Sequence, residues 1–398
     1  MRILVVTHTF FPVVGGAEVG IHEIYSRIGK KHEVLILAPR MGNVVNRKFG
    51  GNDQGYVESG YKVIRFNNSL KVPECFKNIL WGIIPPVSFS MAVSVLLNVK
   101  RFKPDVVNFQ FFKHTGLAVI LLKLFTKVPV VLSLVGRHDV LCKKTPFFWR
   151  VYLKLIVSLC DRVTANSGFY LDYKTLPNLS VIPYGVDCNR FSGSLSLGKQ
   201  MRERLGLKDE QKILFTVQRL AVEKRVDVTI EAMKEIAAEF PDCVLLIAGK
   251  GPEYDSLRKV AADCGVEGNV RFLGYVSRAD LPAFYACCDI FVFHSLFETF
   301  GVVFAEAFAS GKPVVSVNTT AIPEIIIDNY TGLLVPALDP RQFAGAVLRL
   351  LKDNELYSRI SLNVRKAAVE KYNWDIIADK YNVLYLDIQK GKRKSHFC

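Results

Sequence analysis

The sequence lacks the features of a protein held together by disulfides or by structural zinc. Its 398 residues include nine cysteines, but no CxxC pair occurs, and only Cys287 and Cys288 are adjacent. A disulfide framework or a structural zinc site would need paired or regularly spaced cysteines. The sequence therefore predicts reduced thiols in a cytoplasmic environment.

An unbroken membrane-spanning run is also missing. Residues 79–99 carry no charge, but Pro85 and Pro86 interrupt them and basic residues follow. A helix over 87–102 followed by a strand over 105–109 fits this pattern better than a membrane span, which is the alternative. The apolar N-terminus is short and leads into Gly15-Gly16, so we interpret it as a first strand rather than a secretory signal.

Acidic residues are scarce in the first half of the chain. Residues 1–190 contain 25 Lys and Arg against 11 Asp and Glu, a net charge of +14, whereas residues 191–398 contain 27 against 26. Basic surfaces of this kind bind nucleic acid or anionic membrane. No nucleic-acid-binding motif is present, so we expect an anionic membrane surface and rank nucleic acid last. The apolar-basic stretch 71–86 is the expected membrane contact, through Lys71, Phe76, Lys77, Ile79, Leu80 and Trp81.

Strand-like and helix-like segments alternate along both halves, which predicts an α/β protein with two doubly wound parallel sheets. We expect an N-terminal domain over 1–190, a C-terminal domain over 191–374, a helix over 375–390 that packs back onto the first domain, and a tail over 391–398. The polar run 192–199 is the expected linker. The predicted strands are 2–8, 33–38, 61–66, 105–109, 128–135, 162–165, 180–182, 213–217, 244–248, 269–273, 289–293 and 314–317; the predicted helices include 16–28, 87–102, 116–125, 226–240, 253–264, 278–286 and 300–310.

The stretch after the strand 289–293 is the most informative in the chain. Glu306 is the only charge in an apolar helix, and a buried carboxylate is costly unless something pairs with it. The first residues of that helix, Phe300, Gly301, Val302 and Val303, present N–H groups without intrahelical partners, and such a helix start binds anions. A salt bridge between Glu306 and a neighbouring Arg is the structural alternative.

Glu298 and Glu306, with Phe300-Gly301 between them, resemble the Glu-x7-Glu motif of the family 4 retaining glycosyltransferases, which have the GT-B fold. The resemblance implies two Rossmann-like domains facing across a deep cleft. It also implies that Glu306 binds the ribose of a nucleotide-sugar, that Glu298 lies near the donor sugar, and that the amides between them meet its phosphate and sugar.

Two cations follow the strand 213–217. Arg219 and Lys224 stand where this family keeps an Arg and a Lys, although Gln218 and Arg225 replace family glycines. Two cations at the carboxyl end of a strand suit a diphosphate, and ordinary surface charge is the equally weighted alternative. No Asp-x-Asp metal site occurs there, so we expect no metal and no cofactor besides the nucleotide-sugar itself.

Other loops also resemble those of the family, more closely in the C-terminal half than in the N-terminal half. Gly249, Gly251 and Val276 resemble its nucleobase-side loops, and Gly15 and Gly16 resemble its first loop, which touches the donor phosphates and the acceptor. His138 and Asp139 follow the strand 128–135, where the family usually has a His-Gly pair. Since Val135 precedes Gly136 here, an exposed His138 without a catalytic role is the alternative.

The resemblance implies a metal-independent retaining hexosyltransferase that moves a sugar from a UDP- or GDP-sugar to a lipid-linked or glycan acceptor in cell-envelope or glycoconjugate biosynthesis. The cysteine pattern and the basic first half of the chain predict a cytoplasmic enzyme that lies peripherally on the inner face of the membrane. A nucleotide-sugar epimerase of the same fold and a non-catalytic nucleotide-sugar-binding subunit are the alternatives.

Overall fold

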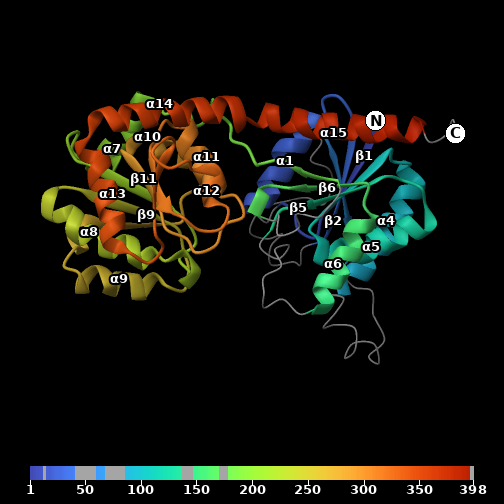
Figure 1. The fold of residues 1–398 in the computed structure, drawn as a ribbon, viewed down its shortest axis with the longest axis horizontal. Coiled ribbons are helices and arrows are strands. Elements are labelled where there is room, and N and C mark those ends of the chain that lie inside the picture. The colour runs from blue at the N-terminus through green and yellow to red at the C-terminus, as the bar shows by residue number, and fades with distance from the viewer. Residues whose placement is uncertain (12–14, 41–59, 68–85, 137–146, 170–177, 395–398) are drawn as a thin grey trace. The chain divides into compact units, whose positions relative to one another are not determined.

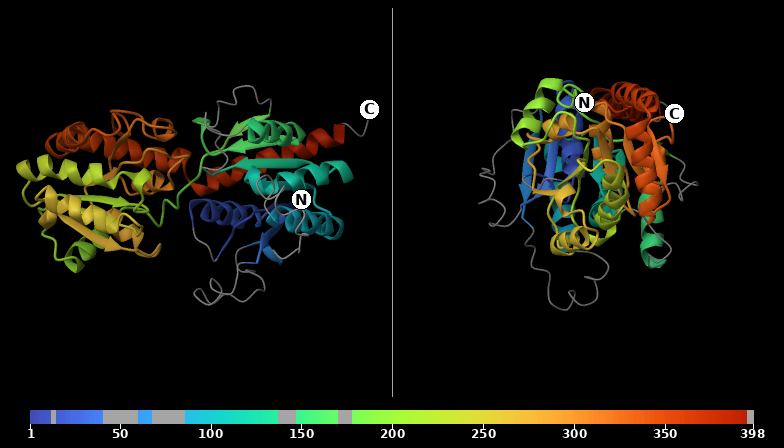
Figure 2. Two further views of the ribbon diagram at one scale, coloured as in Figure 1. Left: turned by 90° about the horizontal axis from the view of Figure 1, so that it is seen from below. Right: turned by 90° about the vertical axis from the view of Figure 1, so that its left-hand side faces the viewer.

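The computed structural model describes residues 1–11, 15–40, 60–67, 86–136, 147–169 and 178–394. It divides the chain into two compact units. Unit 1 contains Met1–Pro183 and Asp375–Cys398, and unit 2 contains Tyr184–Trp374. Helices cover both faces of the sheet in each unit (Figures 1 and 2).

Unit 1 is built on a seven-stranded sheet in which every neighbouring pair is parallel. The strand order is β3-β2-β1-β4-β5-β6-β7. The strands are rich in Val, Ile and Leu because a parallel sheet is covered on both faces. Their bounds are β1 (Arg2–Val6), β2 (Glu33–Pro39), β3 (Lys62–Phe66), β4 (Val106–Gln110), β5 (Val130–Leu134), β6 (Arg162–Ala165) and β7 (Leu179–Val181).

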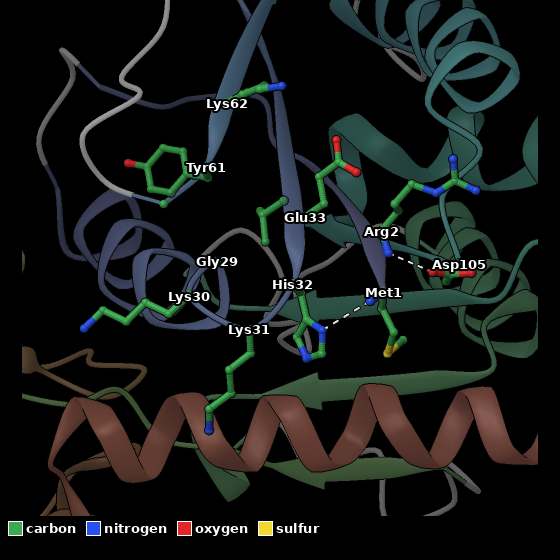
Figure 3. A pocket seen from close by; sticks show the side chains of 12 residues that line it. Met1, Arg2, Gly29, Lys30, Lys31, His32, Glu33, Tyr61, Lys62 and Asp105 are labelled. Carbon is green, nitrogen blue, oxygen red and sulfur yellow. Dashed lines mark hydrogen bonds between the residues drawn. The ribbon is translucent and has the colours of Figure 1, made fainter.

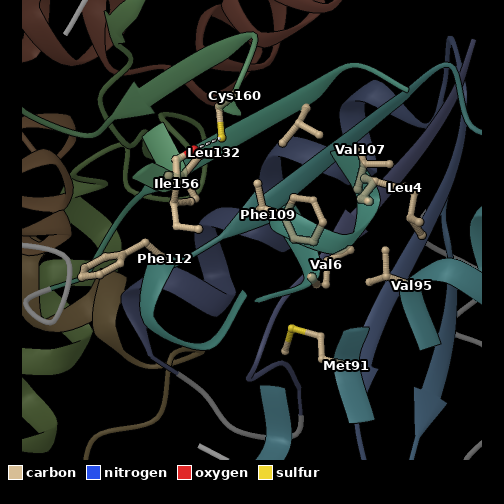
Figure 4. Close-up of a cluster of buried hydrophobic side chains, with 14 of the residues drawn as sticks. Leu4, Val6, Met91, Val95, Val107, Phe109, Phe112, Leu132, Ile156 and Cys160 are labelled. Carbon is tan, nitrogen blue, oxygen red and sulfur yellow. Dashed lines mark hydrogen bonds between the residues drawn. The ribbon is translucent and has the colours of Figure 1, made fainter. Parts of the chain in front are cut away.

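The main apolar core of unit 1 lies between one face of this sheet and three helices, α4 (Pro86–Phe102), α5 (Phe112–Phe125) and α6 (Phe147–Leu159) (Figure 4). Alternate strand residues such as Leu4, Val6 and Phe109 point into it and are fully buried. Burying a side chain of this size contributes about 1.5–3 kcal/mol, so this layer supplies much of the stability of the unit.

The opposite face of the sheet carries α1 (Gly16–Ile28) and α15 (Trp374–Lys394), joined to it through buried polar groups. The Tyr25 and Tyr385 hydroxyls lie 2.7 Å apart, and the Asn108 side-chain amide donates to Tyr385 at 2.7 Å. Arg27 of α1 pairs with Asp375 of α15 at 2.6 Å. The C-terminal helix is therefore part of unit 1.

Unit 2 contains a six-stranded parallel sheet of order β10-β9-β8-β11-β12-β13. Helices α8, α9 and α13 cover one face, and α7, α10, α11 and α14 cover the other (Figure 1). The strands are β8 (Ile213–Val217), β9 (Val244–Ala248), β10 (Val270–Gly274), β11 (Ile290–Phe293), β12 (Val314–Val317) and β13 (Gly332–Val335). The helices are α7 (Leu195–Arg204), η4 (Val222–Lys224), α8 (Val226–Glu239), α9 (Tyr254–Asp263), η5 (Glu267–Asn269), α10 (Leu281–Cys287), α11 (Val302–Ala309), α12 (Ile322–Ile325), α13 (Pro340–Lys352) and α14 (Asn354–Lys371).

The chain divides after Pro183 rather than after residue 190. The reason is a backbone pairing, because the Val186 N–H donates to the Tyr372 carbonyl at 2.7 Å and ties residues 184–190 to unit 2. The tail is also shorter than expected, because α15 continues to Lys394. Residues 395–398 lie outside the described part of the chain.

Two expectations about local structure were wrong, and one helix was not predicted. The polar run 192–199 is no linker, since α7 begins at Leu195 and the Ser194 hydroxyl caps it by accepting from the Leu197 N–H. The helix α6 had no counterpart among the predicted helices. The lone-charge helix α11 is shorter than 300–310, because Gly301 in the left-handed region ends the preceding loop.

Both sheets reverse their winding direction at one place. In unit 1 the neighbouring strands β1 and β4 lie at this switch, and in unit 2 β8 and β11 do. Ligands of open α/β sheets bind outside the carboxyl ends of the strands at such a switch point. The loops that follow these four strands are therefore where functional side chains belong.

Candidate functional site

The switch point of unit 2 holds a partly buried ion pair. Lys224 ends η4 after β8, and Glu298 lies in the loop after β11; the Lys224 ammonium bonds to Glu298 Oε1. Their side chains are only 18% and 14% exposed. Lys224 also donates to the Ser295 hydroxyl at 3.4 Å and lies 5.6 Å from the centre of the Phe293 ring. The structure thus brings together two of the residues that the sequence selected.

Glu298 is held in place by a neighbouring turn. Its backbone N–H donates to the Thr320 hydroxyl at 3.0 Å, and its carbonyl accepts from the Ala321 N–H at 3.4 Å. Thr320 itself has φ = +46°, an uncommon conformation for a residue with a side chain. Strained backbone of this kind persists where the surrounding structure fixes it, often at functional sites.

Arg219 lies on the same loop as Lys224 but is largely exposed. Its guanidinium pairs with Glu223 at 2.5 Å, and its side chain is 66% exposed. An exposed pair of this type contributes little to stability. Arg219 is therefore able to exchange Glu223 for another anion at small cost.

The start of α11 has the geometry of an anion site with a buried aromatic anchor. Gly301 is the N-cap at φ = +80°, and a side chain there would meet the Phe304 ring at 2.6 Å. Phe300 is buried between Tyr184 and Tyr372, so its ring is structural and only its backbone can serve a ligand. The N–H groups of Val302 and Val303 are the first of the helix and have no intrahelical acceptor.

Glu306 lies on α11 and is buried. The Tyr285 hydroxyl donates to Glu306 Oε2 at 3.0 Å. Among the residues described, no Lys, Arg or His nitrogen lies within 4.0 Å of this carboxylate, so the expected alternative of a direct salt bridge is not what the structure shows. Burial raises the pKa of Glu306, and the more distant positive charges of Arg278 and Arg190 oppose that shift.

Three of the residues around Glu306 were not predicted from the sequence. From the sequence alone, Tyr285 is one of several apolar residues in a predicted helix, and Arg190 and Arg278 are indistinguishable from ordinary surface charges. In the structure the Arg190 guanidinium donates to the Arg278 carbonyl. Only the fold of unit 2 brings these groups, remote in sequence, to the carboxylate of Glu306.

Two predicted donor-binding glycines have a structural explanation. A side chain at Gly249 would meet the Gln218 carbonyl oxygen at 1.8 Å, and one at Gly251 would meet that of Leu220 at 1.9 Å. The loop after β9 can therefore pack against the cation-bearing loop only without these side chains. Val276, after β10, is half-buried.

His294 is a buried residue that was not among the predicted site residues. It follows β11 and its Nε2 accepts from the Leu338 N–H at 3.2 Å. Burial lowers the pKa of His294 to about 4, so the ring is neutral at physiological pH. It acts as a fixed hydrogen-bond acceptor that joins the β11 loop to the loop after β13.

The predicted residues of unit 1 divide into two groups. Gly15 is the N-cap of α1 and Gly16 its first residue, and both are exposed after β1. His138 and Asp139 lie outside the described residues, as do the expected membrane contacts in 71–85. Of the basic residues that follow the uncharged run 79–99, Lys100 lies in the last turn of α4 and Lys103 comes directly after this helix.

The cavity in Figure 3 lies away from these switch points. It has a volume of about 740 Å³ and opens at the amino ends of β1 and β2, where Met1, Arg2 and His32 line it. Within the described ranges, no group of three or more His, Cys, Asp or Glu is placed to hold a metal ion. The six cysteines that the structure describes are free thiols.

Comparisons with known proteins agree with this architecture. The family model described as "Glycosyltransferase Family 4" matches residues 14–190, and the model "Glycosyl transferases group 1" matches residues 199–367. The chain is 28% identical over 387 residues to a GDP-mannose-dependent alpha-(1-6)-phosphatidylinositol monomannoside mannosyltransferase of Mycolicibacterium smegmatis, covering 93% of this chain and 94% of the relative.

Two further proteins are similar over most of the chain. An alpha-monoglucosyldiacylglycerol synthase of Streptococcus pneumoniae is 24% identical over 366 residues, covering 88% of this chain and 78% of the relative. The crystal structure of Anabaena HepE in complex with UDP superposes with a TM-score of 0.77 at 22% identity, covering 97% of this chain and all of that one.

The two parallel sheets and their strand order are those of the GT-B fold, which the superposition on HepE shows. The chain belongs to the family 4 glycosyltransferases, and it is an enzyme of that class.

Proposed function

We propose that this enzyme is a retaining, metal-independent glycosyltransferase that moves a sugar from a nucleoside-diphosphate sugar to a lipid-linked acceptor at an anionic membrane surface. The observation that carries the proposal is the Lys224–Glu298 pair at the switch point of unit 2, with Glu306 on the helix that follows. These groups supply a cation for a diphosphate and carboxylates for a sugar and a ribose.

Departure of the nucleoside diphosphate places negative charge on its phosphate oxygens. Lys224, Arg219 and the amides of Val302 and Val303 can stabilise that charge, and each cation is already balanced by a carboxylate before the donor binds. When the diphosphate replaces those carboxylates, Glu298 becomes available to the donor sugar. The sugar–phosphate bond then breaks as the acceptor oxygen bonds to the same face of the sugar, and the hydroxyl proton passes to the departing phosphate.

The first donor to test is GDP-mannose. The Mycolicibacterium relative is described as GDP-mannose-dependent and aligns over nearly the whole of both chains. Its name gives a glycolipid as the acceptor, and the name of the Streptococcus relative gives a glycolipid as the product. Both names support a lipid acceptor for this chain.

A solvent-facing stripe on α6 supports membrane contact. Phe147, Val151 and Leu155, spaced four residues apart, are 81%, 48% and 48% exposed. Lys154 is exposed beside them, and neither α5 nor α6 contains an acidic residue. A helix with an apolar face and flanking cations binds in the plane of an anionic interface. None of the helices in the described part of the chain has the length and apolarity to span a membrane.

A donor panel tests the transfer proposal. The full chain is incubated with GDP-mannose, UDP-glucose and UDP-N-acetylglucosamine, with and without phosphatidylinositol monomannoside in vesicles, and released nucleoside diphosphate and lipid products are measured. Transfer that depends on the lipid supports the proposal. A sugar-nucleotide isomer formed without any acceptor would indicate the epimerase instead.

Vesicle co-sedimentation tests the membrane proposal. We expect binding to vesicles with phosphatidylglycerol but not to neutral phosphatidylcholine vesicles, and we expect Phe147→Ser with Leu155→Ser to abolish it. Leu362→Ser with Val369→Ser, which removes exposed apolar groups from α14 of unit 2, is the matched control. Equal binding to both vesicle types would refute an anionic docking surface.

A further inference from the structure

The two faces of the sheet in unit 1 differ in the side chains that they present. Neighbouring residues of β4 point to opposite faces, so Phe109 enters the apolar core while Asn108 and Gln110 lie on the face that carries α15. The next two strands continue this pattern, since Ser133 of β5 and Thr164 of β6 are fully buried and hydrogen-bonded to the same set of groups. The surface on which α15 lies therefore contains a row of polar side chains.

These side chains form one hydrogen-bonded network that begins and ends on α15. The Tyr381 hydroxyl lies 3.4 Å from Thr164 Oγ1, which donates to Ser133 Oγ at 2.8 Å. Ser133 donates to Asn108 Oδ1 at 3.1 Å, and the Asn108 side-chain amide donates to the Tyr385 hydroxyl at 2.7 Å. The polar network thus leaves α15 at Tyr381, crosses three strands and returns to the same helix one turn later.

Each member of this polar network depends on the next. A hydroxyl has a single hydrogen to donate, so Thr164, which donates to Ser133, accepts the hydrogen of Tyr381. Tyr385 bonds to the Tyr25 hydroxyl at 2.7 Å, which ties the network to α1 as well. Hydrogen bonds in such a chain strengthen one another in a low dielectric, and a missing member leaves its buried neighbours unpaired. The polar network therefore favours one arrangement of α15 over all others.

Apolar contacts alone would not fix the position of α15 along the sheet. Ile377, Leu384 and Ile388 are buried on this helix, and apolar residues of this kind recur at each turn. A slide by one turn, about 5 Å, would bring similar side chains to similar places. Only two tyrosines occur in α15, however, so a single position brings two hydroxyls four residues apart to the ends of the polar network.

Chain connections and surface ion pairs also fix α15 less firmly than they fix other helices. Each of α1, α4, α5 and α6 joins two strands of the sheet, whereas α15 comes after the whole of unit 2 in the sequence. The ion pairs of Arg27 with Asp375 and of Lys31 with Asp379 join α1 to α15, but the two aspartates are 74% and 65% exposed. Exposed pairs contribute little, so the position of α15 depends on the buried groups.

We infer that the polar network is a register lock, a conformational device that lets α15 dock on unit 1 in one position only. Its members are Tyr25, Asn108, Gln110, Ser133, Thr164, Tyr381 and Tyr385. The device specifies position rather than adding stability, because exchange of a whole buried polar network for apolar groups of similar shape is nearly neutral or stabilising. The inference does not depend on the proposed transfer reaction.

Measurement of the position of α15 tests the inference in the full chain. Nitroxides are attached to p-acetylphenylalanine at two exposed positions, Val383 of α15 and Leu155 of α6, and their separation is measured by double electron–electron resonance. The wild type should give a single narrow distance. In a sevenfold variant we expect a second maximum or a distribution about twice as broad, while the thermal midpoint rises or stays within about 3 °C of wild type. The substitutions are Tyr25→Phe, Asn108→Leu, Gln110→Leu, Ser133→Ala, Thr164→Val, Tyr381→Phe and Tyr385→Phe.

Two identical substitutions provide a matched control. Thr164 and Thr115 are both fully buried and hydrogen-bonded, but Thr115 bonds to the Phe111 carbonyl and lies outside the polar network. Thr164→Val should broaden the distance distribution, and Thr115→Val should leave it unchanged, although each lowers the thermal midpoint. Asn108→Leu alone should lower the thermal midpoint by at least about 4 °C, and the addition of Tyr385→Phe should recover part of this loss because it removes an unpaired hydroxyl.

Three outcomes would overturn the inference. A single narrow distance in the sevenfold variant would show that apolar contacts and surface ion pairs suffice to position α15. A fall of its thermal midpoint by more than about 3 °C would show that the polar network supplies stability rather than position. Equal effects of Thr164→Val and Thr115→Val on the distance would show that the network has no special part in docking. Because these measurements need no substrate, none of the results bears on the proposed glycosyl transfer.

Discussion

Replacing Glu306 by Gln separates the function of this carboxylate from its effect on stability. The substitution keeps the shape of the side chain and an oxygen that can still accept from Tyr285, which donates to Glu306 Oε2 at 3.0 Å. It removes the negative charge. If two ribose hydroxyls donate to the carboxylate, each charge-assisted bond becomes a neutral one at a loss of about 1 kcal/mol.

The expected result is that GDP or UDP, whichever the wild type binds more tightly, loses about 30-fold in affinity, which corresponds to about 2 kcal/mol. Glu306→Ala, which removes the acceptor altogether, is expected to cost about 1.5–3 kcal/mol. Isothermal titration calorimetry measures both. Tyr285→Phe is the control, because it removes the structural hydrogen bond but leaves the carboxylate in place.

Stability of the nucleotide-free enzyme should change in the opposite direction. Burial raises the pKa of Glu306 above its ordinary value of 4.5, so the folded state binds this proton more strongly than the unfolded state. The free energy of unfolding therefore falls as the pH rises through the window between 4.5 and the raised pKa. Gln has no proton to lose, so Glu306→Gln should raise the thermal midpoint at neutral pH, and this gain should vanish below about pH 4.

An unchanged nucleotide affinity in Glu306→Gln and Glu306→Ala would refute the ribose role. A lower thermal midpoint for Glu306→Gln at pH 7 would refute the view that the buried negative charge lowers the stability of the folded enzyme and is present because it binds the nucleotide. A gain in stability together with a loss of affinity is the combination that only a functional buried carboxylate predicts.

Three further predictions concern the loops around this helix. Lys224→Ala and Arg219→Ala should each lower kcat about 100-fold or more, because each removes a cation from the departing diphosphate. A chelator should leave the wild-type rate unchanged. Activity that is lost with chelator and restored by manganese would contradict metal independence. Gly301→Ala should destabilise unit 2 by at least about 1–2 kcal/mol, because an L-residue is strained at φ = +80°, and an unchanged thermal midpoint would show that the loop relaxes freely. Arg225→Gly should leave the thermal midpoint within about 3 °C of wild type, because relief of strain at φ = +44° offsets the loss of the ion pair between Arg225 and Asp227. Arg225→Ala loses the ion pair but keeps the strain, so it should be the less stable of the two variants.

Much of the fold is determined locally by the sequence. The alternation of short Val-, Ile- and Leu-rich runs with amphipathic segments predicts parallel sheets, and α1 was predicted at its observed bounds, Gly16–Ile28. The glycine pair at the start of α1 and the spacing of Glu298 and Glu306 carry the family resemblance, because a motif on one loop and helix keeps its geometry wherever the fold places it. The helices α6 and α7 were not predicted, and the polar residues at the start of α7 were interpreted as a linker.

What only the tertiary structure decides is which distant residues meet. The order of strands brings Lys224 to Glu298 and His8 to His114, because β8 lies beside β11 and β1 beside β4. No local pattern encodes these pairings, since strand order depends on the packing of all the helices against both faces of each sheet. Burial is decided in the same way, and it alone gives the carboxylate of Glu306 its raised pKa and its expected cost in stability.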